Sequence, residues 1–125
     1  MSFKTTIEED ANGHVVQESV KRKAIKKSAT VSIAASGADA TATISVPEGE
    51  LWYIKAITVT KGTNVTVDSI TIDGEVFPET ATVSDVEASY GALVSAEKFI
   101  AIQGDNANTT VAEDLTIEVT GYSIV

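Results

Sequence analysis

Few residues of this 125-residue chain could carry out acid–base or nucleophilic chemistry. The chain has no cysteine, which excludes disulfides, thiolate nucleophiles and cysteine-ligated zinc. Its single histidine, His14, lies beside a turn in a charged segment, whereas a catalytic triad needs a histidine held rigidly beside its nucleophile. Asp68, Asp73 and Glu75 surround one predicted turn, and their spacing is equally that of surface acids on a hairpin. We therefore expect no enzymatic activity, no catalytic residues and no cofactor.

The segment 104–114 is rich in oxygen-bearing side chains and is a candidate for calcium binding. Calcium takes six to eight oxygen ligands, usually from a curled loop. The spacing of an EF-hand counted from Asp105 fails, because Ala107 stands where a ligand is needed and Thr110 stands where glycine is needed. The pattern therefore favours a solvated connection over a metal site.

Trp52 and Tyr53 are the candidate glycan contacts, because exposed aromatic rings can stack on sugars. Neighbouring residues of a strand face opposite sides of the sheet. We therefore expect one of the two rings to lie in the core and the other at the surface.

The net charge of −9 is unevenly distributed along the chain. Residues 1–27 hold six basic and four acidic side chains, whereas residues 28–125 hold three lysines and fourteen acids. The candidate assembly contacts form a basic cluster of Lys21, Arg22, Lys23, Lys26 and Lys27. We expect this cluster to dock on an acidic face of its own body or of a neighbouring copy. A solvated tail is the alternative. The acidic body and the lack of interleaved aromatic residues argue against nucleic acid as the main partner.

Two regions are predicted from composition. Residues 1–27 form a charged N-terminal arm or hairpin around the turn signal Asn12-Gly13, with too little apolar surface to fold alone. A disordered tail is the other interpretation of this region. Residues 28–125 form one domain, a length that can bury a core without metal or disulfides.

The domain is predicted to consist of antiparallel strands, because apolar and polar residues alternate with a period of two. The predicted strands cover 29–35, 41–46, 51–60, 65–72, 99–103 and 115–125, and 51–60 is apolar enough at its start for a central strand covered on both faces. The turn at 36–39 is expected to use a positive φ at Gly37. Asp73-Gly74 predicts a tight hairpin turn.

Three irregularities are expected within this pattern. The apolar positions change from odd to even numbers near Asp68, and again across Gly121 before Tyr122 and Ile124. A β-bulge at each place would keep the apolar residues on one face, so two bulges are predicted. Residues 83–94 show helical spacing, and Ser84 with Glu87 resembles a capping box. These patterns together predict an all-β fold, an antiparallel β-sandwich or jelly roll with an extended N-terminal arm.

The segment Val-Pro-Glu-Gly-Glu-Leu-Trp-Tyr-Ile-Lys-Ala-Ile at 46–57, the hairpin at 70–74 and the closing strand at 119–124 resemble small β-sandwich virion proteins. These are accessory subunits of tailed phages and archaeal viruses. The resemblance covers about residues 40–125 and implies a decoration, turret, fibre or connector role, with no site residues to carry over.

That resemblance and the charged arm lead to a functional expectation. We expect a homo-oligomeric structural subunit of a virion, with copies of itself and other virion or assembly proteins as partners and no membrane contact. No signal-peptide stretch is visible at the N-terminus, so synthesis in the host cytoplasm is expected. The alternative is a carbohydrate-binding or adhesive β-sandwich module that uses Trp52 and Tyr53.

Overall fold

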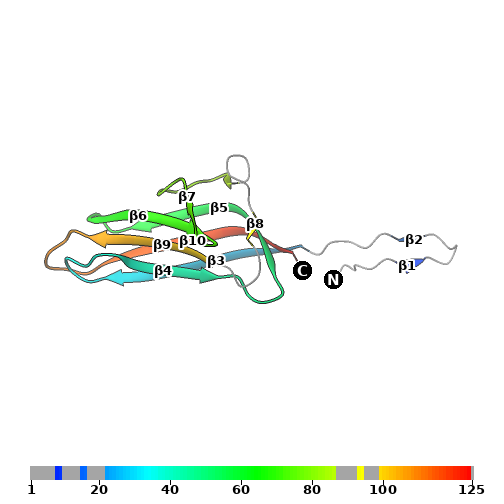
Figure 1. The fold of residues 1–125 in the computed structure, drawn as a ribbon, viewed down its shortest axis with the longest axis horizontal. Helices are drawn as coiled ribbons and strands as arrows, with labels where there is room; N and C mark the ends of the chain where they lie inside the picture. Colours follow the sequence, from blue (N-terminus) through cyan, green and yellow to red (C-terminus); the bar gives the residue numbers. More distant parts are fainter. Residues whose placement is uncertain (1–7, 10–14, 17–21, 87–92, 95–98, 125) are drawn as a thin grey trace.

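The protein is a sandwich of two antiparallel β-sheets (Figure 1). The computed structural model describes residues 8–9, 15–16, 22–86, 93–94 and 99–124. One sheet has the strand order β3-β10-β5-β8 and the other β4-β9-β6-β7, and the two pack face to face. Their strands are β3 (Arg22–Ile33), β4 (Ala40–Ser45), β5 (Leu51–Lys61), β6 (Val65–Ile72), β7 (Glu75–Phe77), β8 (Leu93–Val94), β9 (Phe99–Asn106) and β10 (Glu113–Ile124). The predicted all-β sandwich is confirmed. No helix among the described residues is long and apolar enough to cross a membrane.

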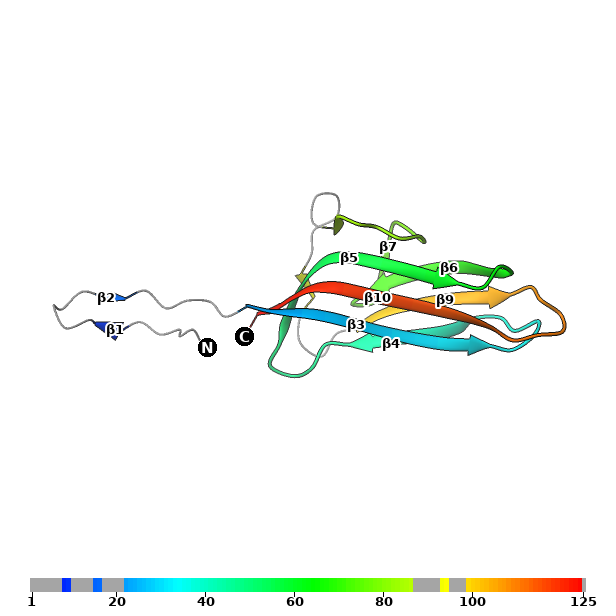
Figure 2. The ribbon, with the colours of Figure 1, turned by 180° about the vertical axis from the view of Figure 1, so that it is seen from behind.

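A separate pair of short strands precedes the sandwich. β1 (Glu8–Glu9) and β2 (Val15–Val16) pair antiparallel, with Glu8 opposite Val16 and Glu9 opposite Val15. Both lie beyond the end of the sandwich at which β3 begins and β10 ends (Figures 1 and 2).

The core lies between the two sheets and is aliphatic. Alternate residues of β10 and β9 point into it and are fully or almost fully buried, as the period of two predicts. Leu115, Ile117 and Val119 of β10 belong to the same buried cluster as Ile100 and Ile102 of β9. The threonines and serines between the core residues of β4 face outward.

β3 begins earlier than the sequence indicates. The domain was predicted to start at Ser28, but β3 starts at Arg22 and pairs with β10 throughout, from Arg22 opposite Ile124 to Ile33 opposite Glu113. Residues 22–27, assigned to the arm from sequence, therefore belong to a strand of the sandwich. Their lysines break the alternation of apolar and polar residues from which strands were predicted. At the edge of a sheet, long charged side chains can stay in solvent while the backbone pairs.

The bulge predicted near Asp68 is confirmed. In the pairing of β6 with β9, Val67 lies opposite Gly104 and Ser69 opposite Gln103, so Asp68 is the extra residue. The register of β10 against β5 also shifts at Gly121, as predicted.

The second bulge adds its residue to β5 instead of β10. Thr120 lies opposite Ala56 and Gly121 opposite Ile54, so Lys55 has no residue opposite it on β10. A bulge on β10 would have turned Tyr122 and Ile124 into the core, and this expectation is wrong. Ser123 is buried instead, and its two neighbours are half-buried on the outer face. Gly121 is required because a Cβ there would overlap the Tyr53 carbonyl oxygen.

Two local predictions are corrected. The helical spacing at 83–94 does not give a helix at either end, since Val83 forms an isolated β-bridge with Ile57 and residues 93–94 form β8. Val86 is helical, and Glu87 of the expected capping box lies outside the described residues. In the turn at 36–39, positive φ angles occur at Ser36 (59°) and Asp39 (58°), and not at Gly37. Gly37 is needed for space instead, because a Cβ would lie 2.8 Å from the Ala34 carbonyl oxygen. The tight turn at Asp73-Gly74 has the expected positive φ at both residues.

Asn106, the last residue of β9, holds the far end of the sandwich together. It is 1% exposed, and its Nδ2 donates to the carbonyl oxygens of Ile33 and Val111, both at 3.0 Å. Its Oδ1 accepts the N–H of Asn108 at 2.8 Å. One side chain thus joins the end of β3 to the connection between β9 and β10. This connection, predicted to be solvated over 104–114, spans only 107–112 and is bound to the sandwich.

We expect Asn106→Leu to lower the free energy of unfolding by about 2–4 kcal/mol. Leucine is similar in size to asparagine, but it has no N–H group to donate to the buried carbonyl oxygens. Urea unfolding measures the loss. Thr109→Ala, at an exposed position of the same connection, is the control and should change stability little. A loss for Asn106→Leu no larger than that of the control would contradict the role of Asn106.

Candidate functional site

The first half of β3 forms a basic edge of the sandwich. Four members of the basic cluster, Arg22, Lys23, Lys26 and Lys27, lie on this strand and are exposed, whereas Lys21 is outside the described residues. Ile25 between them is buried and anchors the strand to the core. Lys23 and Lys27 share the face of Ile25 and, with Pro47, Glu50 and Ser123, line a groove of about 380 Å³ at the rim of the sandwich.

Two hydrogen bonds hold the carboxylate of Glu50 in place in this groove. Its Oε1 accepts hydrogen bonds from Trp52 Nε1 at 2.8 Å and from Ser123 Oγ at 2.9 Å. These two bonds, and then the positive charges of Lys23 and Lys27, lower the pKa of Glu50 below its ordinary value. Glu50 therefore remains ionised at neutral pH and ties β5 to β10 beside the basic edge.

The basic cluster is partly balanced by acids of its own sandwich. Lys26 Nζ lies 3.9 Å from Glu118 Oε2, across the β3–β10 pair. The lysine of this pair keeps 73% of its side chain exposed, so the interaction is screened and contributes at most about 1 kcal/mol. The exposed positive charge of the edge thus remains accessible to a partner.

The structure leaves one of the two candidate glycan contacts at the surface. Trp52 is 1% exposed and belongs to the core, where its indole N–H donates a hydrogen bond to Glu50. Tyr53 faces the other way, as alternation along the strand predicts, and is half-buried on the outer face of the sheet. The start of β5 was predicted to be covered on both faces. Its outer face is not fully covered, since Lys55 is exposed.

Tyr53 belongs to a patch that the sequence did not show. It lies opposite Tyr122 on β10, with ring centroids 6.4 Å apart and planes at 40°. The guanidinium of Arg22 lies 5.7 Å from the centre of the Tyr122 ring. We call Arg22, Tyr53 and Tyr122 the tyrosine patch. Such rings offer an apolar face with polar tips, which suits contact with protein or with the apolar face of a sugar. Only the register of β10 reveals this patch, because it keeps Tyr122 outside.

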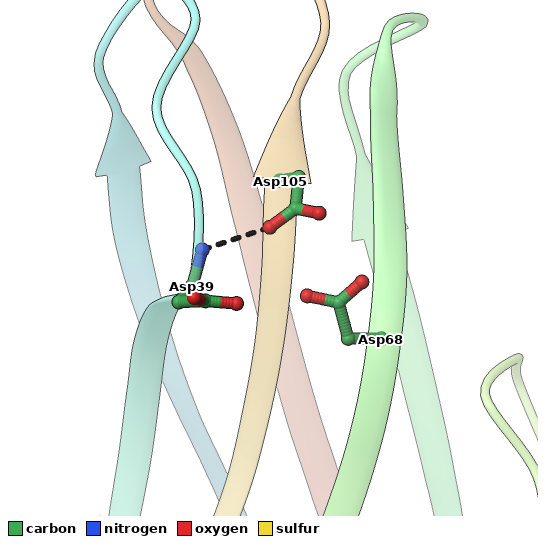
Figure 3. Close-up of side chains that lie close together, drawn as sticks. All are labelled: Asp39, Asp68 and Asp105. Carbon is green, nitrogen blue, oxygen red and sulfur yellow. Dashed lines mark hydrogen bonds between the residues drawn. The ribbon is translucent and has the colours of Figure 1, made fainter.

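A second cluster lies on the other sheet, where three carboxylates meet (Figure 3). Asp39 precedes β4, Asp68 is the bulge residue of β6, and Asp105 lies on β9. Their nearest carboxylate oxygens all lie within 4.8 Å of one another, and Asp105 Oδ1 accepts the N–H of Asp39 at 2.8 Å. Asp73 and Glu75, which the sequence grouped with Asp68, lie instead at the β6–β7 turn.

The pKa of Asp68 is raised in this cluster. Reduced solvation is the largest cause, followed by repulsion from Asp105, a hydrogen bond with Asp105 and repulsion from Asp39. Carboxylate oxygens are ligands for hard cations such as calcium or magnesium. These three residues are the group of described side chains that could hold such an ion, and Asp105 is the only one within the segment 104–114.

Glu113, at the other end of that segment, is held by hydrogen bonds from two asparagines. Glu113 accepts hydrogen bonds from the side chains of Asn64 and Asn108 and from the N–H of Asn64. In that order, the bonds from the two side chains and the backbone N–H lower the pKa of Glu113. This carboxylate joins the β5–β6 turn to the β9–β10 connection. Its bonds are therefore those of a structural tie.

The chain matches no protein-family model, no curated protein and no solved structure. Its function therefore has to be inferred from the geometry of these surfaces.

The raised pKa of Asp68 gives a pH-dependent prediction. The folded state binds the Asp68 proton more tightly than the unfolded state does, so this group destabilises the protein at neutral pH and the effect disappears as pH falls through its folded pKa. We expect Asp68→Asn to raise the midpoint of thermal unfolding at pH 7 and to have a smaller effect at about pH 4.

The measurement is thermal unfolding followed by circular dichroism at both pH values. Glu75→Gln, which removes one negative charge from an exposed residue of β7, is the matched control. An equal gain for Asp68→Asn at both pH values would show that repulsion within the cluster is not its cause.

Proposed function

We propose that the protein is a structural subunit of a virus particle, of the capsid decoration, turret or connector type, that acts by self-assembly and protein–protein contacts. The observation that carries the proposal is the position of β1 and β2, which lie clear of the two sheets beyond one end of the sandwich (Figures 1 and 2). Strands in this position can reach a neighbouring molecule.

The surfaces at that end also support an assembly role. Arg22, which starts β3, also contacts Tyr122 near the end of β10, so the basic edge and the tyrosine patch are continuous. Arginine and tyrosine are enriched in protein–protein interfaces, where they combine apolar contact with hydrogen bonding. Glu50 and Glu113, two carboxylates with lowered pKa values, are held in hydrogen bonds that join neighbouring elements of the sandwich. Their arrangement suits a rigid scaffold.

The alternative is a carbohydrate-binding or adhesive module. Tyr53 and Tyr122 favour it, because two outward aromatic rings on adjacent strands form a surface on which a sugar can stack. The two functions are separated by a glycan array with the wild type and with Tyr122→Ser. Strong binding that this substitution abolishes would favour the module, whereas no binding leaves the assembly role.

The assembly proposal predicts the behaviour of the purified protein and its location in particles. We expect light scattering to give masses that are multiples of the monomer at roughly 0.1 M salt. This association should persist at roughly 1 M salt, where the Debye length falls to about 3 Å, because apolar contacts of Tyr53 and Tyr122 do not depend on charge.

Antibodies against the protein should label intact particles of the virus whose genome encodes it. Tyr122→Ser should weaken association, and Thr58→Ala, at a half-buried position further along β5, is the control. A wild type that remains monomeric and is absent from purified particles would contradict the proposal.

A further inference from the structure

The early start of β3 reverses the charges on which assembly was expected to depend. With β3 beginning at Arg22, the segment before it is residues 1–21, called here the N-terminal segment. It holds two basic side chains, Lys4 and Lys21, and four acidic ones, which gives a net charge of −2. The basic cluster, apart from Lys21, lies on the sandwich. With this distribution of charge, an acidic N-terminal segment and a basic edge attract each other.

β3 offers a free backbone edge. It is the last strand of its sheet and pairs with β10 alone, so the hydrogen-bonding groups on its other side have no strand partner among the described residues. β4 packs near β3 but pairs only with β9, in the other sheet. The free edge is 12 residues long, and Arg22, Lys23, Ala24, Lys26, Lys27 and Ser28 along it are exposed. A long exposed edge is a template for another strand.

The charges on this edge select the kind of strand that can pair with it. Four of the six lysines and arginines among the described residues lie within the first six residues of β3. Side chains directly opposite each other on paired strands lie about 5 Å apart, so a basic edge repels a basic strand and attracts an acidic one. The remainder of the sandwich carries a large excess of acids and repels an acidic strand elsewhere.

β1 is an acidic strand in a suitable position. It consists of Glu8 and Glu9, is already extended, and pairs with β2 on one side only. It lies beyond the end of its own sandwich, away from the free edge of its own β3 (Figures 1 and 2). The strand that it can reach in this arrangement is β3 of another molecule.

We propose that β1 of one copy pairs with residues 22–27 of β3 in a second copy and so extends the β3-β10-β5-β8 sheet across the interface. Backbone hydrogen bonds join the two strands. Because Glu8 and Glu9 are adjacent, they point to opposite faces of the extended sheet. One therefore meets the face of Lys23 and Lys27, and the other meets the face of Arg22 and Lys26. The inference rests on the proposed function, since it names the contact through which the subunit assembles. Lysines on an edge can alternatively serve only to prevent pairing, and the experiment separates the two roles.

Charge reversal on each side of the contact tests the pairing. Glu8→Lys/Glu9→Lys makes the donor strand basic. Lys23→Glu/Lys26→Glu/Lys27→Glu makes the edge acidic, because only Arg22 then remains positive among residues 22–27. At roughly 0.1 M salt, each variant alone should associate about tenfold or more weakly than the wild type, because like charges then face each other. An equimolar mixture of the two variants should regain association, because each strand again meets an edge of opposite charge.

Two controls keep the outcome interpretable. Glu75→Lys/Asp114→Lys makes the same change of net charge as the donor variant at exposed positions outside β1 and should associate as the wild type does. If the triple edge variant unfolds because Glu50 and Glu118 then face further acids, Lys23→Ser/Lys26→Ser/Lys27→Ser replaces it and should weaken association in the same direction. Thermal unfolding verifies that each variant is folded.

Sedimentation velocity on the single variants and the mixture decides the question. Single variants that associate like the wild type, or a mixture that does not recover, would overturn the pairing while a self-associating wild type leaves the assembly role standing. A monomeric wild type would overturn the pairing, and its absence from purified particles as well would overturn the assembly role.

Discussion

The pairing of β3 with β10 along twelve residues of each strand is the contact on which the other features depend. Backbone groups need partners, and β10 supplies them from Ile33 back to Arg22, although the first half of β3 has only Ile25 to bury. Because β3 is an edge strand, its lysines and arginine can remain in solvent while its backbone stays in the sheet. This pairing turns a charged terminal segment into a structured, basic edge, and it leaves the residues before Arg22 with an acidic charge balance.

The central position of β10 also decides which aromatic residues are available at the surface. Its straight alternation keeps Ser123 inside and Tyr122 outside, and the extra residue of the bulge, Lys55, is in β5. Gly121 makes this possible, because any side chain there would overlap the backbone of Tyr53. Trp52 then belongs to the core with its N–H bonded to Glu50, whereas Tyr53 and Tyr122 face outward beside Arg22. The tyrosine patch and the basic edge are thus products of one register.

The acidic residues serve different purposes according to their partners. Glu50 and Glu113 accept hydrogen bonds and join neighbouring elements, so their charges are stabilised by the fold. Asp39, Asp68 and Asp105 lie close together, and the raised pKa of Asp68 makes its charge destabilising at neutral pH. Glu8 and Glu9 form β1, a strand that lies outside the sandwich. A scaffold whose two ends are tied by Glu50 and Asn106, with strands extending beyond one end, is suited to assembly.

Sequence patterns were enough to predict the fold class, the strands β4, β5 and β6, the bulge at Asp68 and the turn at Asp73-Gly74. Each of these follows from alternation or turn chemistry within a few neighbouring residues, which operates locally. The folded structure alone reveals the start of β3 at Arg22, the outward position of Tyr122, the bridge of Val83 to Ile57 and the meeting of three distant aspartates. These features depend on which strand lies opposite and in what register, and that pairing joins residues too far apart in the chain for a local pattern to record.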